Sequence, residues 1–220
     1  MATRNIRITK DSFSLCSDLD WNQVVFPCYV EPKIDGVRCA VYCDANGTVH
    51  AFTRTGRELT TFANAPCFAE LSAIQNVVFD GELTVGDSWN DTASAIKKRQ
   101  LTNEELKSAR FVAFDIMNDG AEDYVQRRDA LIGFSEMGIF EILTVTYCKN
   151  RTEIVEAFAC EVAAGFEGIV VKDPAAKYIA GRSCAFMKLK PQATTDVFKD
   201  GQCFEMLNGR VFRVRDDKVD

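Results

Sequence analysis

The stretch from Glu31 to Arg38 contains a lysine, a carboxylate two residues later, a glycine and an arginine. Residues of these types can hold a nucleotide while a lysine amine attacks its phosphate, so Lys33 is the candidate nucleophile. Apolar residues that favour strands lie on both sides, at 24–26 and 37–42. This pattern predicts that Lys33 lies on a turn between two strands, with the Asp-Gly step forming the bend. An ordinary hairpin with a solvated Lys–Asp pair is the other interpretation that these residues alone allow.

Further along the chain, other charged residues terminate or line predicted strands. Strand ends that carry unlike charges can converge on one cleft. Because His50 is the only histidine, Ser–His and Cys–His catalysis are disfavoured, and the chemistry must come from Lys, Arg, Asp and Glu. The nine cysteines are odd in number and form no CxxC pair, so we interpret them as structural thiols. The charged groups are Arg54 and Arg57, Asp80 and Glu82, Glu167 and Lys172, and Lys188 and Lys190.

The composition is that of a globular protein. The 220 residues are 47% hydrophobic and include 16 Phe, which suits one large domain, or one domain with a small appendage. No apolar run reaches the roughly 18 residues of a membrane helix, and the N-terminus has no apolar signal region. We therefore expect a soluble cytoplasmic protein, in the host cytoplasm if it is viral, with no membrane partner. The net charge of −6 argues against a generally basic nucleic-acid coat but leaves room for local basic groups such as 97–99.

Strands and helices alternate irregularly, with hairpins as well as crossovers, which is typical of the α+β class. Thr102 followed by Glu105 forms a capping box and predicts a short helix. An Asn-Gly step predicts a C-terminal hairpin of 203–207 with 210–215. The other expected elements are strands at 48–53, 77–79, 111–117, 140–148 and 186–190, helices at 59–75, 121–136 and 154–162, and a polar loop at 86–92.

In their order along the chain and in their residue types, the charged stretches resemble the motifs of the covalent nucleotidyltransferases, and among them those of the ATP-dependent DNA ligases. The resemblance covers residues 22–191 and is greatest to short bacteriophage ligases. It implies a nucleotidyltransferase (ATP-grasp-like) catalytic domain of antiparallel sheets flanked by helices at 1–192, and a short hairpin at 193–220. The matching motifs are Lys33–Arg38, Thr53–Gly56, Asp80–Glu82, Phe114–Ile116, Glu167–Lys172 and Lys188–Lys190.

The resemblance implies that Lys33 becomes adenylylated from ATP with the help of Mg²⁺. An unperturbed lysine has a pKa of about 10.4, so a free amine is scarce near neutrality. Removal from water and three neighbouring cations, Lys172, Lys188 and Lys190, would favour the neutral nucleophile. The same cations would neutralise the triphosphate, with Lys188 and Lys190 at the α-phosphate.

The resemblance also assigns roles to the remaining matched residues. Phe114 would stack on adenine, and Glu31 would lie beside the adenine edge. The polar assignments are Arg38 and Arg54 for the ribose and the 5′-phosphate of a nick, Glu82 for the ribose or a metal ion, and Glu167 for a catalytic metal ion.

The implied activity is ATP-dependent sealing of 3′-OH/5′-phosphate nicks in duplex DNA through a lysyl-AMP intermediate, as DNA repair and replication require. The alternatives are an RNA ligase acting on nicked RNA or hybrid duplex, and a nick- or nucleotide-binding module that has lost turnover. Only 32 residues precede Lys33, which favours ATP because NAD-dependent ligases carry a nicotinamide-binding module there. Glu167 followed by Lys172 disfavours mRNA capping enzymes, whose fourth motif usually opens with Asp.

The C-terminal part departs from the family pattern. Ligases of this kind continue into an OB-fold barrel, and five barrel strands do not fit in the 29 residues after Pro191. We interpret the hairpin as the start of an OB-fold; the alternative is that 213–218 resembles the sixth ligase motif. We expect a monomer that is a natural minimal form, a fragment, or a protein that needs a separate OB-fold partner. Arg127-Arg128 resembles a helix position common in the family, either structural or on the DNA side.

Overall fold

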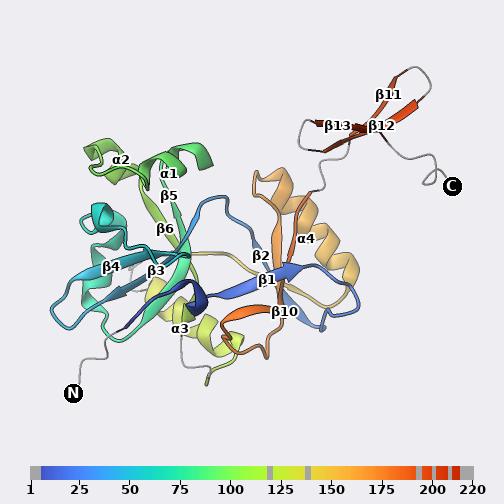
Figure 1. Cartoon of the computed structure of the whole chain (residues 1–220). Coiled ribbons are helices and arrows are strands. Elements are labelled where there is room, and N and C mark those ends of the chain that lie inside the picture. Colours follow the sequence, from blue (N-terminus) through green and yellow to red (C-terminus); the bar gives the residue numbers. More distant parts are fainter. Residues whose placement is uncertain are drawn as a thin grey trace. The chain divides into compact units, whose positions relative to one another are not determined.

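The computed structural model describes residues 6–117, 121–136 and 140–191 with their side chains, and the backbone of three strands between 195 and 213. The chain divides into two compact units, Met1–Leu189 and Lys190–Asp220. The first unit consists of two five-stranded sheets with helices packed against them (Figure 1). None of the helices in the described ranges has the length and apolar character needed to cross a bilayer.

The first sheet contains the strand that leads to Lys33. All its strand pairs are antiparallel except β1–β10, which is parallel. Helix α4 (Arg151–Ala163) packs against β2, β8 and β9, where Ile154 joins a buried apolar cluster with Val30 and Ile169. This helix was predicted, and its end at Gly165, with φ +94°, is confirmed. The strand order is β1 (Ser14–Asp18), β10 (Gly181–Leu189), β9 (Ile169–Lys172), β2 (Cys28–Pro32) and β8 (Thr146–Cys148).

The second sheet contains the strand that leaves the Lys33 loop. Its core includes Leu83 and Phe111, which pack with Phe62, Phe68 and other apolar side chains from the connecting segments. The β3–β4 connection is the turn expected at Asp44–Gly47, where the Asp44 amide donates to Thr48 O. The strand order is β4 (Val49–Thr53), β3 (Val37–Cys43), β5 (Val78–Thr84), β6 (Arg110–Met117) and β7 (Glu141–Ile142).

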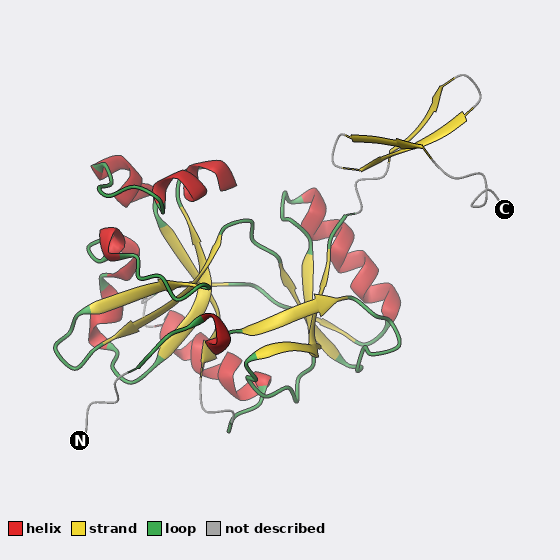
Figure 2. Ribbon diagram, viewed as in Figure 1, coloured by secondary structure: helices red, strands yellow, loops and turns green. Residues whose placement is uncertain are grey.

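Helices cover the second sheet and connect its strands (Figure 2). Helix α2 starts with the predicted capping box, because Thr102 accepts from the Glu105 amide and Glu105 accepts from the Thr102 amide. Helix α3 confirms the helix expected at 121–136, whose closing glycine lies outside the described residues. The elements are η1 (Lys10–Ser12), η2 (Thr60–Phe62), η3 (Pro66–Phe68), η4 (Glu70–Ala73), α1 (Trp89–Ala95), α2 (Asn103–Ser108) and α3 (Tyr124–Glu136).

The surroundings of Lys33 differ from the predicted hairpin. Strands β2 and β3 belong to different sheets, so residues 33–36 form a crossover between sheets. The strand before Lys33 is β2, whereas residues 24–26 precede it and leave Val25 and Phe26 exposed. Local residue preferences suggested a hairpin, but partners distant in sequence decided which sheet each strand joined.

Three other expectations were wrong in part. Residues 59–75 form three short 3-10 turns, since Pro66 lacks the amide hydrogen that a continuous helix needs. The strand expected at 140–148 is two short strands, β7 and β8, in different sheets. The polar loop at 86–92 ends early, because Ser88 caps α1 by accepting from the Asp91 amide.

The second unit contains three antiparallel strands, β11 (Thr195–Lys199), β12 (Gln202–Leu207) and β13 (Arg210–Arg213). Leu207 pairs with Arg210, so β12 and β13 form the predicted hairpin with a two-residue loop. The loop residues 208–209 and the end of the expected strand, 214–215, lie outside the described residues. The additional strand β11 was not predicted.

Candidate active site

Lys33 and Glu167 face each other where β2 ends and β9 is about to begin. The Lys33 amide donates to Gly168 O at 2.8 Å, and the Glu167 amide donates to Lys33 O at 2.9 Å, which extends the β2–β9 pairing. Nζ of Lys33 donates to Oε2 of Glu167 and forms an ion pair with it. The two side chains are 25% and 26% exposed, so solvent and small molecules can reach both.

The charge around Lys33 differs from the expectation. We expected neighbouring cations, but the described partner of its ammonium is the Glu167 carboxylate. Two of the expected cations are engaged elsewhere, Lys172 with Glu31 at 2.8 Å and Lys188 with Asp18 at 3.2 Å.

Arg38 is held in a fixed orientation on β3. Its Nε and Nη2 donate to the two oxygens of Asp80 at 3.0 and 2.6 Å, a bidentate geometry. The Tyr178 hydroxyl donates to the same Asp80 carboxylate at 2.6 Å. The guanidinium carbon lies 5.4 Å from the Phe13 ring centroid and 5.3 Å from that of Phe114, within the range of cation–π attraction. These contacts leave Arg38 little freedom to reorient.

Glu82 lies opposite Arg38 in the β3–β5 register. Burial raises the pKa of Glu82 to about 7. The positive charges of Lys33 and Arg38 oppose this shift in pKa, and the negative charges of Asp80 and Glu167 add to it. These charges come from both sheets, so Glu82 marks the place where the two halves of the site meet. Near neutral pH this carboxyl group can be either protonated or ionised.

Gly36 allows the Lys33 loop to lie close to β5. A Cβ at this position would be 2.7 Å from Leu83 O and 2.8 Å from Cγ of Glu82. Any side chain here would push the loop away from the sheet. The glycine that suggested a hairpin bend is therefore needed for close approach.

Glu31, two residues before the nucleophile, forms a buried ion pair with Lys172. Their side chains are 2% and 4% exposed, and Nζ of Lys172 lies 2.8 Å from Oε2 of Glu31. The Tyr124 hydroxyl donates to Oε1 of Glu31 at 2.5 Å, and burial raises the pKa of Tyr124 well above its usual value. Lys172 also donates to Phe114 O at 3.1 Å. Pairing of this kind is what makes two buried charges tolerable.

Arg127 has the surroundings of a structural residue, which is the first of the two roles expected for this helix position. It is 2% exposed, and its Nε and Nη2 donate to Asp115 at 2.6 and 3.2 Å. Nη1 donates to the carbonyls of Glu122 and Ala176. Since Asp115 follows Phe114 directly, Arg127 helps to fix the strand on which the Phe114 ring lies.

The structure does not bring every predicted site residue into this group. Arg54 is exposed in the loop after β4 and has no described contact with the others. Lys188 lies on β10 and pairs with Asp18, whose side chain is 89% exposed. Lys190 is the first residue of the second unit, so its role stays a prediction.

Some residues of the site were missed in the sequence. Tyr124 was identified only as an apolar helix position, and Tyr178 and Phe13 were not singled out. A tyrosine on an apolar helix face needs a partner for its hydroxyl, and this was the available signal for Tyr124. Tyr178 and Phe13 carry no local signal, because their respective partners, Asp80 and Arg38, are distant in the sequence.

Glu82 and Glu167 offer carboxylate oxygens to a divalent cation. No group of three or more potential metal ligands occurs within the described residues. Mg²⁺ commonly uses only one or two carboxylates and completes its octahedron with water and substrate phosphates. The two carboxylates therefore fit a magnesium ion that binds together with a nucleotide.

Comparison with known proteins assigns the fold to a family. The family model described as ATP dependent DNA ligase domain matches residues 20–190. A probable DNA ligase of Streptomyces griseus is 30% identical over 194 residues, covering 78% of this chain and 37% of that protein. One of Dictyoglomus turgidum is 30% identical over 180 residues, covering 74% and 31%. The chain thus spans about a third of the length of these curated relatives.

Solved structures share the fold. The Chlorella virus DNA ligase-adenylate has a TM-score of 0.67 at 24% identity, covering 96% of this chain and 84% of that chain. The bacteriophage T7 ATP-dependent DNA ligase in complex with ATP has a TM-score of 0.61 at 16% identity, covering 94% and 81%. With its motifs in order on this fold, the chain belongs to the ATP-dependent DNA ligase domain family.

Proposed function

We propose that the protein is an ATP-dependent DNA ligase that seals nicks between a 3′-OH and a 5′-phosphate in duplex DNA. The observation that carries this proposal is the cluster of Lys33, Glu167, Glu82 and Arg38 in a member of the ligase domain family. A lysine amine, two carboxylates and a fixed arginine are the groups that nucleotidyl transfer to an amine requires.

The first step consumes ATP. Nζ of Lys33 loses its proton and attacks the α-phosphorus; an N–P bond forms, the bond to the bridging oxygen breaks, and pyrophosphate leaves. A 5′-phosphate oxygen of the nick then attacks the same phosphorus and releases Lys33. Finally the 3′-OH attacks the 5′-phosphate, and AMP departs. Magnesium held by Glu82 and Glu167 would supply neutralisation of the leaving pyrophosphate.

The other residues bind and orient ATP and the nick. Phe114 stacks on the adenine, and Glu31 lies beside the adenine edge, where Tyr124 and Lys172 hold its carboxylate. Lys188 and Lys190 bind the α-phosphate. Arg38 contacts the ribose, and its contacts with Asp80 keep it in place. Arg54 is exposed and contacts the 5′-phosphate of the nick.

The covalent step is tested by mass spectrometry of the whole chain after incubation with ATP and Mg²⁺. We expect a mass increase of one AMP on Lys33, and none in Lys33→Arg, which keeps a cation opposite Glu167. An adduct that persists in Lys33→Arg would refute the assignment of the nucleophile. An unmodified wild-type chain that also fails to join a pre-adenylylated nick would refute the ligase function and leave a nick-binding module.

Sealing rates on matched nicks with deoxy or ribo 3′ ends separate DNA ligase from RNA ligase. We expect the deoxy substrate to be joined faster. The second unit is interpreted as the start of an OB-fold, supported by its antiparallel strands. If a longer barrel is needed, self-adenylylation is slow while joining of a pre-adenylylated nick persists, and adding a separate OB-fold domain restores the first step.

A further inference from the structure

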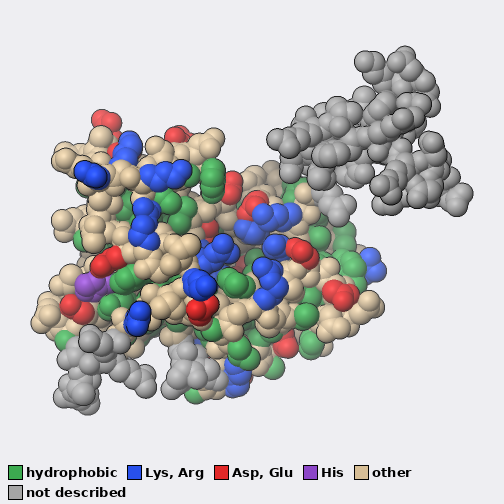
Figure 3. Space-filling model, in the orientation of Figure 1, with side chains coloured by type: hydrophobic (Ala, Val, Ile, Leu, Met, Phe, Trp, Pro, Cys, Tyr) green, Lys and Arg blue, Asp and Glu red, His purple; other side chains and the backbone are tan. Residues whose placement is uncertain are grey.

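Arg38 is largely covered, unlike the cations on the surface of the first unit. Figure 3 shows Lys and Arg side chains at the surface of one face, whereas the side chain of Arg38 is only 18% exposed. Its guanidinium carbon lies 5.4 Å from the ring centroid of Phe13, which is 0% exposed. Removal from water strengthens the attraction between a cation and an aromatic ring, so this contact should be stronger than one at the surface.

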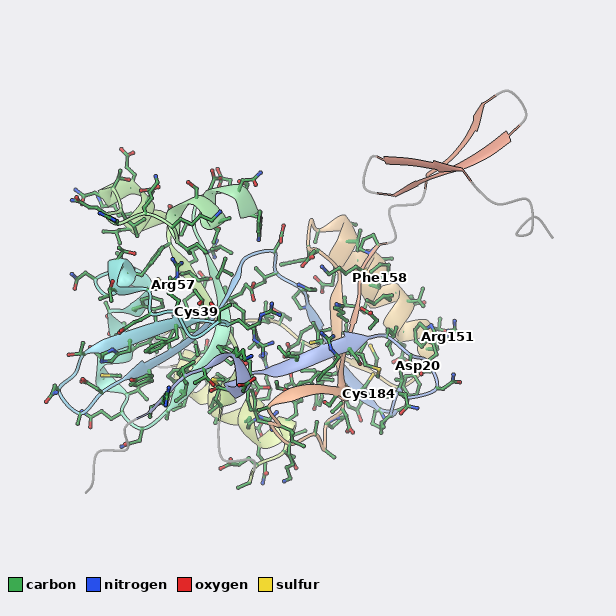
Figure 4. The ribbon with its side chains drawn as sticks, in the orientation of Figure 1. Asp20, Cys39, Arg57, Arg151, Phe158 and Cys184 are labelled. Atoms are coloured by element: carbon green, nitrogen blue, oxygen red, sulfur yellow. The ribbon has the colours of Figure 1, made fainter. Side chains whose placement is uncertain are left out.

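Phe13 is attached to the first sheet through its backbone and to the second sheet through its ring. It directly precedes β1, and the Gly181 amide of β10 donates to Phe13 O at 2.9 Å. Its ring packs in a buried apolar cluster that includes Ala40 of β3. In Figure 4, Cys184 marks β10 and Cys39 marks β3, one strand in each sheet. The contact of this ring with the arginine therefore spans the two sheets that form the site.

The next residue, Ser14, reaches the same arginine by a second route. Its amide donates to the Tyr178 hydroxyl at 3.2 Å, and this hydroxyl donates to Oδ2 of Asp80 at 2.6 Å. The same oxygen accepts from Nη2 of Arg38 at 2.6 Å. Two consecutive residues at the start of β1 therefore act on Arg38, one through an aromatic ring and the other through a chain of hydrogen bonds.

One nitrogen of the guanidinium is available to a ligand. Asp80 accepts from Nε and Nη2 of Arg38, and among the described residues Nη1 makes no hydrogen bond. Nη1 can therefore donate to a hydroxyl of the ribose. A guanidinium that is less firmly held would place Nη1 less often where the ribose needs it, so its loosening should weaken nucleotide binding.

We propose that Phe13 is a positioning residue for ATP, and that its ring holds the Arg38 guanidinium in the orientation that contacts the ribose. This inference rests on the proposed function, because that function assigns Arg38 to the ribose. Phe13 acts through Arg38 and touches no reacting atom. Its loss should therefore weaken nucleotide binding more than it slows the attack of Lys33 at saturating ATP.

The first test compares the wild type with Phe13→Leu, which removes the ring and keeps an apolar side chain. Titration calorimetry of the full chain with Mg²⁺ measures the affinity for an ATP analogue in which carbon replaces the α–β bridging oxygen, so that pyrophosphate cannot leave. We expect the dissociation constant to rise about tenfold, as the loss of a desolvated cation–π contact implies. Formation of the Lys33 adduct at saturating ATP should slow by less than about threefold.

Two controls separate positioning from general packing. Phe62→Leu makes the same change at a residue that is also 0% exposed but belongs to the core cluster of the second sheet, and its affinity should match the wild type. In an Arg38→Gln background, Phe13→Leu should have no further effect, because the ring then has no cation to hold. Equal losses in Phe13→Leu and Phe62→Leu, or an undiminished effect of Phe13→Leu in the Arg38→Gln background, would overturn the proposal.

A second series leaves the shape of the ring almost unchanged. Site-specific replacement of Phe13 by phenylalanines with one, two and three fluorine atoms withdraws electron density from the ring and weakens its attraction for a cation. We expect the affinity for the analogue to fall stepwise along the series, while the urea midpoint of unfolding stays constant. A constant affinity along the series would overturn the proposal even if Phe13→Leu fails to fold.

Failure of this inference and failure of the proposed function give different results, because the calorimetry needs no turnover. Analogue binding without any adduct on Lys33 would refute the ligase function, and the affinities of the variants would still decide the role of Phe13. Normal adduct formation with the same analogue affinity in Phe13→Leu and wild type would refute only the positioning role. A wild-type chain that binds no analogue would refute both.

Discussion

Lys33 and Glu167 are joined both through their backbones and through their side chains. The backbone hydrogen bonds extend the β2–β9 ladder to both residues, so the two cannot separate without breaking the end of this ladder. The two side chains also form an ion pair. A phosphate that is to react with Nζ of Lys33 must therefore replace the contact of this amine with the Glu167 carboxylate.

Glu167→Gln tests this relationship. The amide keeps the size and can still accept a hydrogen bond from Lys33, but it removes a metal ligand. We expect adduct formation at saturating ATP and Mg²⁺ to slow about 100-fold, with unfolding free energy almost unchanged because the pair is partly exposed. Transfer of radiolabel from ATP measures the rate, and Glu156→Gln on the exposed face of α4 is the control. A wild-type rate in Glu167→Gln would remove Glu167 from the mechanism.

Tyr178→Phe tests how Arg38 is positioned. The variant deletes the donor to Asp80 and leaves the Ser14 amide without its acceptor at 3.2 Å. We expect a loss of about 1–3 kcal/mol in unfolding free energy, measured in urea. We also expect the rate of nick sealing to fall by more than the loss of folded protein accounts for.

Tyr147→Phe is the control for that experiment, since Tyr147 is 48% exposed. It should leave stability and sealing unchanged. If both tyrosine variants behave alike, the Tyr178–Asp80 hydrogen bond has no role in holding Arg38.

Glu82→Gln should change the pH dependence of stability. The pKa of Glu82 is raised from its usual value of 4.5 to about 7, so the folded state disfavours ionisation. The wild type therefore loses stability as pH rises from 4.5 to 7, on the order of 1–3 kcal/mol in total, and the amide does not. We expect Glu82→Gln to gain stability relative to wild type across that interval. The measurement is urea unfolding of both proteins at pH 5 and pH 8. If the difference in unfolding free energy between Glu82→Gln and wild type were the same at both pH values, this prediction would be contradicted.

Gly36→Ala should disturb the Lys33 loop. A methyl group there would lie 2.7 Å from the carbonyl oxygen of Leu83. This oxygen belongs to the backbone of β5, which cannot move away as easily as a side chain can. We expect a loss of about 1–3 kcal/mol and a slower first step, measured by unfolding and adduct formation. Gly133→Ala is the matched control, because nothing lies within 4 Å of a Cβ in the middle of α3. That change should stabilise by up to about 1 kcal/mol, and a similar gain in Gly36→Ala would show that the loop can move away.

The sequence predicted local elements well wherever a local signal existed. The capping box of α2, the Asp44–Gly47 turn and the end of α4 at Gly165 were all found where expected. It also brought Lys33, Glu82 and Glu167 together, because their motifs lie at strand ends. The wrong hairpin at Lys33 arose because sheet membership depends on partners more than 100 residues away, such as Gly168.

The ion pairs within the site were less predictable from the sequence than the identity of the residues that form it. A lysine motif does not reveal that Lys172 is buried against Glu31, or that the neighbour of Lys33 is an acid. These facts depend on side-chain direction and burial, which residue spacing does not determine. The same holds for Tyr178, whose hydroxyl reaches Asp80 across 98 positions of sequence.

Strand β1 lies before the region that the family model matches, yet it forms the outer edge of the first sheet beside β10. A recombinant protein trimmed to the family boundary at residue 20 would leave the backbone groups of β10 open along that edge. Open edges of this kind recruit strands from other molecules. Such a trimmed protein should therefore self-associate, and we expect this to be seen first as low solubility.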